Sequence, residues 1–322
     1  MATCRRTPPA GSLTRGPAAT KAAEVVGVRE VRSVAVIGAG TMGSGIAQLA
    51  AASGFGVTLV DVDLGLAERG CANIERRLAR AVERGQLTAE EREQALARVR
   101  PAAGVDAAAQ ADFVVEAVVE DLEVKKATFR ALDALVGEDV VLATNTSSMS
   151  ITEIGAATRR PERVVGMHFF NPAPVMRLVE VIHGYATHPD TVAAAMDLAR
   201  RLGRTPIEVR KDSPGFIVNR ILIPLIIEAC KVVEEGLATA EDVDTAITLG
   251  LNHPMGPLTL LDFTGVDVNQ YVMDYFFSEF RQPQYATPRL IRELVRAGRL
   301  GRKVGHGVYD YDPATGRRLP PA

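Results

Sequence analysis

The sequence has few cysteines, little net charge and no long apolar run. Its three cysteines, Cys4, Cys71 and Cys230, are far apart and show no metal-ligand spacing. Isolated thiols of this kind are typical of a reducing compartment and indicate neither a disulfide framework nor a metal site. The net charge of -2 argues against a nucleic-acid partner, which calls for a marked basic excess. No apolar run reaches the roughly 18 residues of a membrane span, so we expect a soluble, cytoplasmic protein with no membrane partner.

The first 30 residues lack a periodic apolar pattern. They are rich in arginine, proline and glycine and contain no apolar segment of the kind found in secretory signals. We expect residues 1–30 to be a disordered extension, and their arginine content leaves an organelle transit peptide as the alternative. The full chain of 322 residues is too long for one ordinary core and suits two domains.

A glycine-rich turn between a strand and a helix begins the patterned part of the chain. Residues 34–37 are apolar and mostly β-branched, as expected of a strand buried on both faces. Glycines follow in G-x-G-x-x-G spacing, and a helix is predicted for residues 46–52. Such glycines permit a tight turn, close approach to a pyrophosphate and tight helix packing, while the helix start offers free N–H groups. We predict that a dinucleotide binds at Gly38, Gly40, Thr41, Met42 and Gly43.

Asp61 strengthens this prediction. It ends a second apolar strand, residues 57–60, and lies about 20 residues past the glycines, where a carboxylate accepts hydrogen bonds from the adenosine ribose. A carboxylate there would repel a 2′-phosphate, so NAD is favoured over NADP. An ordinary turn between a strand and a helix is the alternative, but it does not account for the acid.

A helical hairpin is predicted after Asp61. The chain does not return to the sheet for roughly fifty residues, which is longer than usual connections. Apolar residues recur at helical spacing between residues 74 and 82. Thr88 and Glu91 then form a capping box that opens a second helix.

Arginines form a stripe on the first helix of this hairpin. Arg76, Arg80 and Arg84 recur at every fourth position opposite the apolar residues, with Arg77 beside them. Two interpretations remain open. The stripe is either a solvated face, which the neighbouring glutamates favour, or a cationic arm for a polyphosphate substrate.

Polar side chains follow another predicted strand. Residues 113–119 and 140–143 are apolar runs, and the second ends in Thr144-Asn145-Thr146-Ser147-Ser148. Groups at the carboxyl end of a parallel strand point into the ligand crevice of such a sheet. Asn145 and Ser147 are therefore candidate binding residues, although hydroxyls of this loop can also cap the following turn.

His168 and Glu180 form a candidate catalytic pair. His168 ends an apolar strand and precedes Asn171 and Pro172, while Glu180 lies within the apolar run 178–182. A carboxylate in such a run is costly unless it is paired. A buried acid that orients an imidazole general base explains both residues. A lone histidine of this kind is more often a satisfied core residue, but the buried acid favours catalysis.

The pattern becomes helical near residue 210. Ser213-Pro214 is a helix-start signal, and residues 216–235 are unusually apolar, with Asn219 a polar exception. Both faces of this helix are expected to be covered, partly by a second subunit, which predicts a homodimer.

These patterns predict an α/β fold with two domains. A Rossmann-type doubly wound sheet with a helical-hairpin insertion is expected for residues 31–210. An all-helical domain for substrate binding and dimerisation is expected for residues 211–322.

Six motifs together resemble the L-3-hydroxyacyl-CoA dehydrogenases, and most closely the single-function bacterial 3-hydroxybutyryl-CoA dehydrogenases. The resemblance runs from about residue 31 to residue 311. The motifs are Gly38-x-Gly40-x-Met42-Gly43, Glu116-Ala-Val-Val-Glu120-Asp-Leu-x-Val-Lys125, Asn145-Thr-Ser-Ser148, His168-Phe-Phe-Asn-Pro172, Asp212-Ser-Pro-Gly-Phe-Ile-Val-Asn-Arg220 and Asn252-His-Pro-Met-Gly-Pro257.

The resemblance implies an NAD-dependent enzyme that interconverts a short-chain (3S)-3-hydroxyacyl-CoA and its 3-oxoacyl-CoA. His168 corresponds to the catalytic base and Glu180 to the acid that orients it. Ser147 and Asn219 correspond to residues near the reacting oxygen of the substrate, and Asn171 to one near the substrate and the nicotinamide.

The resemblance also implies further binding residues. Four positions correspond to cofactor contacts: Asp61, Glu120, Lys125 and Lys303. Arg84 falls where the family has a basic residue for the CoA moiety, which favours the cationic arm, whereas Arg77 stands where some members carry serine.

Two other functions remain as alternatives. A dehydrogenase for free β-hydroxyacids would typically carry a lysine in its helical domain, where this chain has Asn219. A non-catalytic NAD-binding protein would be marked by loss of His168, Glu180 or Ser147, and all three are present.

Overall fold

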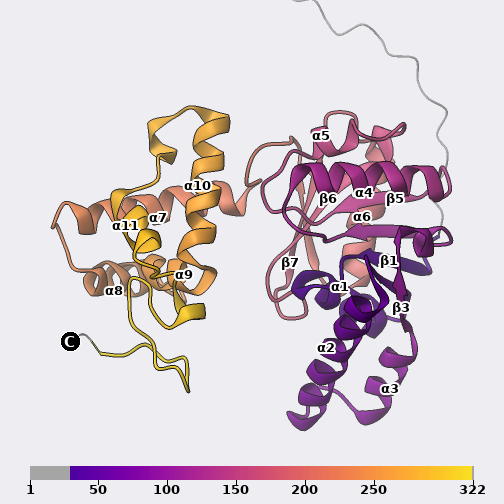
Figure 1. Ribbon diagram of the computed structural model, residues 1–322, viewed down its shortest axis with the longest axis horizontal. Coiled ribbons are helices and arrows are strands. Elements are labelled where there is room, and N and C mark those ends of the chain that lie inside the picture. Colours follow the sequence, from indigo (N-terminus) through magenta and orange to yellow (C-terminus); the bar gives the residue numbers. More distant parts are fainter. Residues whose placement is uncertain (1–29, 321–322) are drawn as a thin grey trace, which may run out of the picture.

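The computed structural model describes residues 30–320, so the predicted N-terminal extension lies outside the described residues except for Glu30. Figure 1 shows two bodies, one built around a sheet and one helical. The sheet has eight strands in the order β3-β2-β1-β4-β5-β6-β7-β8. The strands are β1 (Ser33–Ile37), β2 (Gly56–Asp61), β3 (Val99–Ala103), β4 (Phe113–Glu116), β5 (Val141–Thr144), β6 (Val164–Phe169), β7 (Leu178–His183) and β8 (Thr205–Val209).

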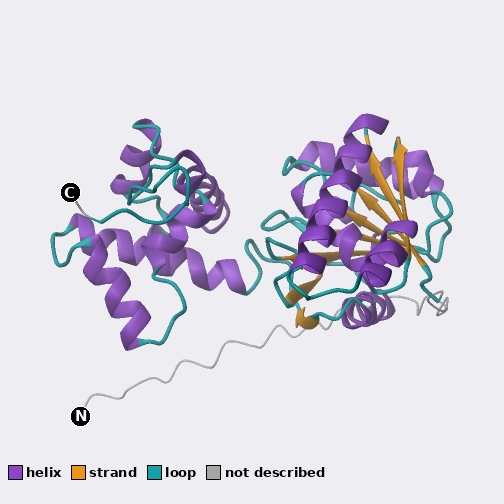
Figure 2. Cartoon of the chain, turned by 90° about the horizontal axis from the view of Figure 1, so that it is seen from below, coloured by secondary structure: helices purple, strands orange, loops and turns teal. Residues whose placement is uncertain are grey.

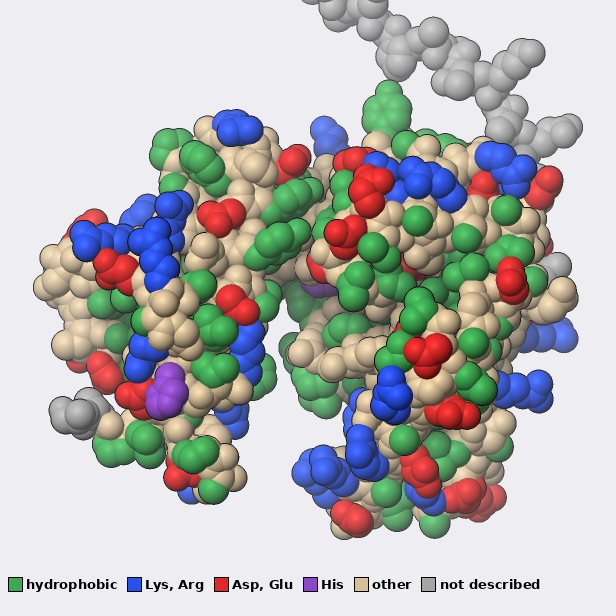
Figure 3. All heavy atoms as spheres, viewed as in Figure 1, with side chains coloured by type: hydrophobic (Ala, Val, Ile, Leu, Met, Phe, Trp, Pro, Cys, Tyr) green, Lys and Arg blue, Asp and Glu red, His purple; other side chains and the backbone are tan. Residues whose placement is uncertain are grey.

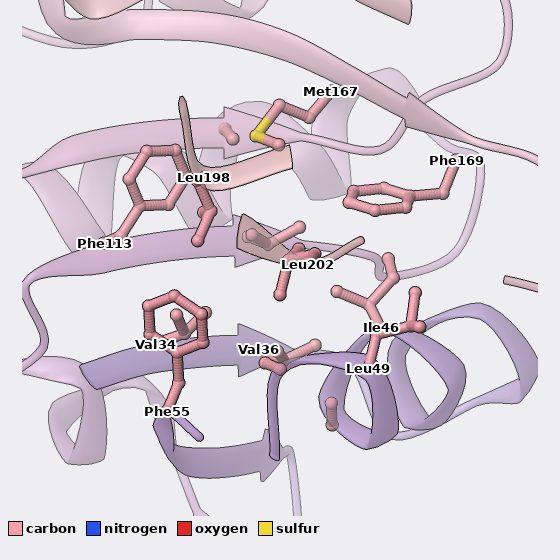
Figure 4. Packing of buried hydrophobic residues seen from close by; sticks show 14 of the residues in the cluster. Val34, Val36, Ile46, Leu49, Phe55, Phe113, Met167, Phe169, Leu198 and Leu202 are labelled. Atoms are coloured by element: carbon pink, nitrogen blue, oxygen red, sulfur yellow. The ribbon is translucent and has the colours of Figure 1, made fainter. Parts of the chain in front are cut away.

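Helices cover both faces of this sheet (Figure 2). They are α1 (Thr41–Ala52), α2 (Leu64–Glu83), α3 (Ala89–Ala97), α4 (Leu122–Leu135), α5 (Ile151–Gly155) and α6 (Pro189–Arg201). Successive residues of a strand point to opposite faces. In β1, Val34 and Val36 join the cluster with Ile46 and Leu198, which Figure 4 shows, while Ala35 and Ile37 join the cluster under α4. Burial on both faces explains the continuous apolar runs and confirms the predicted doubly wound α/β fold.

The last two strands run against the others. β1 to β6 are parallel along the sheet, but β7 pairs antiparallel with β6, and β8 is parallel to β7. This reversal places residues of β6 and β7 directly opposite one another, which decides the geometry of the site.

The hairpin between β2 and β4 is present, but the chain returns to the sheet earlier than predicted. Helices α2 and α3 form the hairpin, and the capping box of Thr88 and Glu91 is made. β3 then pairs with β2 at the edge of the sheet. Its side chains are mostly exposed or half-buried and it contains Pro101, which edge strands tolerate. The expected gap of roughly fifty residues was therefore wrong, because a polar edge strand with proline has no apolar run.

The second body is helical. Its helices are α7 (Val218–Glu234), α8 (Ala240–Gly250), α9 (Pro257–Thr264), α10 (Val266–Phe280) and α11 (Arg289–Arg296). They surround their own apolar cluster, which includes Ile226, Leu261 and Phe276. Among the described residues, no helix combines the length and apolar character of a membrane span.

Candidate active site

A cavity of about 1590 Å³ lies between the two bodies and is lined by both. The space-filling view shows the molecule hollowed at this place (Figure 3). The carboxyl ends of β1, β2, β4, β5 and β6 meet there, together with α7 and α10. The structure brings twelve of the predicted site residues to this wall: Gly38, Gly40, Thr41, Met42, Asp61, Glu120, Lys125, Asn145, Ser147, His168, Asn171 and Asn219.

The three glycines of the turn meet different constraints. Gly38 has a φ of +99°, and a Cβ at Gly43 would lie 1.7 Å from the carbonyl oxygen of Gly38, so the fold itself requires both. A Cβ at Gly40 would meet nothing within 4 Å. Gly40 precedes α1, which no side chain caps. The open space beside free helix-start N–H groups fits an anionic pyrophosphate.

Asp61 is held against the same turn. Its Oδ2 accepts from Ala39 N at 2.7 Å and its Oδ1 accepts from Val62 N at 2.8 Å. The carboxylate thereby stays at the cavity wall with further lone pairs for ribose hydroxyls, which fits NAD.

One face of α2 continues this end of the cavity. Leu66, Arg69, Gly70 and Asn73 line it, at the i, i+3, i+4, i+7 spacing of a single helix face. The sequence analysis assigned these residues no role. Their helical spacing after Asp61 was the signal that could have identified them.

His168 and Glu180 are cross-strand partners. They stand opposite each other in the antiparallel register of β6 and β7, and Nδ1 of His168 lies 2.7 Å from Oε2 of Glu180. Their side chains are 7% and 0% exposed. Because a carboxylate accepts hydrogen bonds, we assign the ring proton to Nδ1, which leaves Nε2 as the basic nitrogen.

The other oxygen of Glu180 is bound by the start of α7. Oε1 accepts from the N–H groups of Ile217 and Val218, both at 2.9 Å. The ring of Phe216 lies 5.6 Å from that of His168, centroid to centroid. The pair of His168 and Glu180 thus touches the junction of the two bodies, a contact that the sequence did not reveal.

Ser147 and Asn219 approach from the two bodies. Asn219 Nδ2 donates to the carbonyl oxygen of Ser147 at 3.3 Å. Ser147 also donates to Oε1 of Glu120, from N at 2.9 Å and from Oγ at 3.3 Å. Asn145 stands at the base of this loop and accepts from Phe169 N at 2.9 Å. Hydroxyl and amide groups thus gather beside His168.

A buried ion pair supports this loop. Lys125 is 1% exposed and its Nζ lies 2.8 Å from Oε1 of Glu116 and 3.2 Å from Oε2 of Glu120. Burial raises the pKa of Glu120, but Lys125 and the hydrogen bonds from Thr146 and Ser147 outweigh it, so the pKa lies below its usual value. Glu116 received no role from the sequence, although it was an acid in an apolar strand, the signal that identified Glu180.

Besides Gly43, three predicted binding residues lie outside the cavity wall. Nζ of Lys303 is 2.7 Å from both carboxylate oxygens of Asp267, and it is Asp267 that lines the cavity. Arg77 is half-buried and donates from Nε to Gln48 Oε1 at 2.7 Å. Burial and the neighbouring Arg76 lower its pKa. Arg84 is exposed at the end of α2.

Known proteins resemble this chain along most of its length. Two family models match, "3-hydroxyacyl-CoA dehydrogenase, NAD binding domain" over residues 33–213 and "3-hydroxyacyl-CoA dehydrogenase, C-terminal domain" over residues 215–311. A protein of Bacillus subtilis named "Probable 3-hydroxybutyryl-CoA dehydrogenase" is 46% identical over 89% of this chain and 99% of its own length. The "3-hydroxyadipyl-CoA dehydrogenase" of Escherichia coli is 47% identical over 87% of this chain and 59% of its own length.

A solved structure has the same fold. The crystal structure of (S)-3-hydroxybutyryl-CoA dehydrogenase from Ralstonia eutropha matches with a TM-score of 0.85 and 46% identity. The match covers 88% of this chain and 100% of that one.

Proposed function

The chain belongs to the 3-hydroxyacyl-CoA dehydrogenase family, and we propose that it interconverts (3S)-3-hydroxybutyryl-CoA and acetoacetyl-CoA with His168 as acid and base. The observation that supports this mechanism is the contact of 2.7 Å between His168 and the buried Glu180 on the wall of the shared cavity. Relatives named for 3-hydroxybutyryl-CoA support the short chain.

In the oxidative direction, Nε2 of His168 takes the proton of the C3 hydroxyl. Glu180 keeps the ring in the tautomer that presents Nε2 and stabilises the imidazolium that results. The ion pair forms in a nearly dry place, since Glu180 is 0% exposed. NAD supplies the hydride acceptor when it is bound.

Ser147 and Asn219 hold the C3 oxygen. The hydroxyl of Ser147 and the amide of Asn219 both donate hydrogen bonds, and donors placed where charge changes stabilise the transition state. Because one comes from the sheet body and one from α7, both bodies must be in place for catalysis. Asn171 lies on the same wall, where it contacts substrate and nicotinamide.

The cofactor residues divide into direct and indirect contacts. The glycine turn, Asp61 and Asn145 face the cavity and bind NAD directly. Lys125 holds Glu120 in place, because its ammonium is already shared by two carboxylates. Lys303 acts through Asp267, to which it is bound.

The exposed arginines of α2 bind the phosphates of CoA. Arg76, Arg80 and Arg84 are exposed, and Lys and Arg side chains gather along the hairpin on the side of the gap between the bodies (Figure 3). Of these arginines, Arg84 is the one that we expect to contribute most to CoA binding. Arg77 is half-buried against Gln48, and its role is to support α2.

The enzyme is a cytoplasmic homodimer in this proposal. Large apolar side chains of the helical body are exposed, among them Ile221 at 66%, Leu237 at 75% and Leu249 at 81%. A second copy that covers them would remove this surface from water. Sedimentation of the purified chain tests the assembly, and a monomer at all concentrations would contradict it.

The decisive experiment follows the absorbance of NADH. Purified protein is mixed with NADH or NADPH and with acetoacetyl-CoA, 3-oxoadipyl-CoA or free acetoacetate. Fast oxidation of NADH with acetoacetyl-CoA supports the proposal. A preference for 3-oxoadipyl-CoA would instead indicate a substrate like the one for which the relative from Escherichia coli is named. Turnover with free acetoacetate alone would contradict the proposal that the substrate is a CoA thioester.

A further inference from the structure

The segment between β8 and α7 is fastened to α5 by Asp212. Its Oδ2 accepts from Ser150 Oγ at 2.6 Å and from Thr152 N at 2.8 Å. Ser150 itself caps α5, since its Oγ accepts from Glu153 N at 3.1 Å. Asp212 thus adds a second, distant acceptor to the start of a short helix.

This helix directly follows the loop that carries Ser147. At the near end of the loop, Asn145 N donates to the carbonyl oxygen of Glu116 at 2.8 Å. Within it, Thr146 Oγ1 accepts from Met149 N at 3.0 Å. At the far end stands Ser150, which is bound to Asp212. The position of the loop is therefore set at both ends.

The same segment reaches the site again a few residues later. The N–H groups of Ile217 and Val218 bind Glu180, and Asn219 binds the carbonyl oxygen of Ser147. One stretch of chain thus holds the Ser147 loop at two points and Glu180 at a third.

The backbone between these points has little freedom. Gly215 and Phe216 have φ values of +73° and +52° in succession, a region that non-glycine residues rarely adopt. A Cβ at Gly215 would lie 2.1 Å from the ring of Phe276 in α10. Residues 215 and 216 are thus sterically confined, and we expect a shift at Asp212 to reach residues 217–219.

We propose that Asp212 is a positioning residue of the reaction. It fixes the Ser147 loop and the start of α7 in one arrangement. In that arrangement the Ser147 hydroxyl and the Asn219 amide can both donate to the C3 oxygen, whose proton His168 takes. The proposal rests on the proposed function, in which those two residues hold the C3 oxygen. An ordinary helix cap, which would affect stability alone, is the competing role.

The test compares Asp212→Ala with Thr239→Ala. Thr239 caps α8, accepting from Asp242 N at 3.1 Å, and it does not line the cavity. Both changes remove a side-chain acceptor from the start of a helix and are expected to lower the Tm. We expect only Asp212→Ala to reduce kcat with acetoacetyl-CoA, by about tenfold to a hundredfold, as misplaced reacting groups do, with little change in the KM for NADH.

Two further measurements separate positioning from stability. The primary isotope effect on kcat, measured with NADH deuterated at the transferred position, should rise in Asp212→Ala because hydride transfer becomes limiting. Asp212→Asn keeps an acceptor oxygen and should restore most of kcat. A kcat of Asp212→Ala within twofold of the unchanged protein, at a Tm like that of Thr239→Ala, would overturn the proposal.

Hydrogen exchange tests the same claim without turnover. In Asp212→Ala the amides of residues 145–152 and 217–219 should exchange faster, while Thr239→Ala leaves them unchanged. Unchanged exchange in both variants would refute the positioning role. If the unchanged protein turns over no thioester, the proposed function fails, and this measurement still decides whether Asp212 fixes the loop.

Discussion

The two ends of the cavity are built in different ways. The end where we place the cofactor comes mostly from one stretch, Gly38 to Asp61, and depends on backbone conformation, a helix start and a carboxylate held by amides. The end where we place the reaction comes from four separate places in the chain, at Ser147, His168, Glu180 and Asn219, which are brought together by strand pairing and by contacts across the two bodies. In the proposed function, cofactor binding is therefore mostly a local property of this chain, whereas catalysis depends on how strands and bodies are assembled.

The largest effect that would test this contrast is expected from the variant His168→Gln. We expect kcat to fall by about two to four orders of magnitude, the scale of acid–base catalysis, while NADH binding, followed by its fluorescence, stays unchanged. His183→Gln is the matched control, because His183 also pairs with a glutamate, Glu208 at 2.8 Å, but lies outside the cavity wall. Near-normal turnover of His168→Gln would show that the pair is structural.

A pair of glycine changes tests the cofactor end. Gly43→Ala would place its Cβ 1.7 Å from the carbonyl oxygen of Gly38, so we expect a marked fall in Tm and loss of NADH binding. Gly40→Ala meets nothing in the protein, so its Tm should be unchanged while the Kd for NADH rises about tenfold, or roughly 1.4 kcal/mol. If Gly40→Ala binds NADH normally, the open space is not the pyrophosphate site.

Lowering the pH tests the contribution of Glu120, the carboxylate that binds Ser147, to the stability of the fold. The folded-state pKa of Glu120 lies below its usual value, which is about 4.3. Glu120 therefore contributes stability that is fully present above that usual value and is lost as the pH falls through the lowered pKa. Thermal melts should show a steeper loss of Tm in this range for the unchanged protein than for Glu120→Gln, and parallel losses would contradict this origin.

The smallest effect is expected on α2. Arg84→Ala should raise the KM for acetoacetyl-CoA about threefold at low salt, because single exposed charge contacts are worth under about 1 kcal/mol and are screened by salt. Acetoacetyl-pantetheine, which lacks the nucleotide, is the control and should show no change. Arg77→Ala should instead lower the Tm, since Arg77 packs against Gln48. An equal KM change with both substrates would remove the arginine from CoA binding.

The sequence predicted what is local. The glycine turn, the buried strands and the capping box of the hairpin follow from neighbouring residues, and the structure has them. β3 was missed because Pro101 and its exposed neighbours give no apolar run. The reversed direction of β7 could not be predicted either, since strand direction is set by packing of distant parts of the chain.

The candidate site shows the same limit. The cost of burying a carboxylate identified Glu180 and linked it to His168, and the family resemblance supported the pair. The same cost applied to Glu116, which binds Lys125 in the interior. The position of Arg77 beside the arginine stripe does not show that its side chain bonds to Gln48 of α1, and its contact with CoA stays a prediction.

The contact between Glu180 and α7 has an evolutionary consequence. Glu180 accepts from the main-chain N–H groups of residues 217 and 218, so these hydrogen bonds do not depend on the side chains at the two positions. Ile217 is 38% exposed. Mutation at these two positions can alter the surface of the second body and leave Glu180 in place. Lineages can therefore diversify the surface of the second body, and in the proposed mechanism each descendant keeps the carboxylate that orients His168.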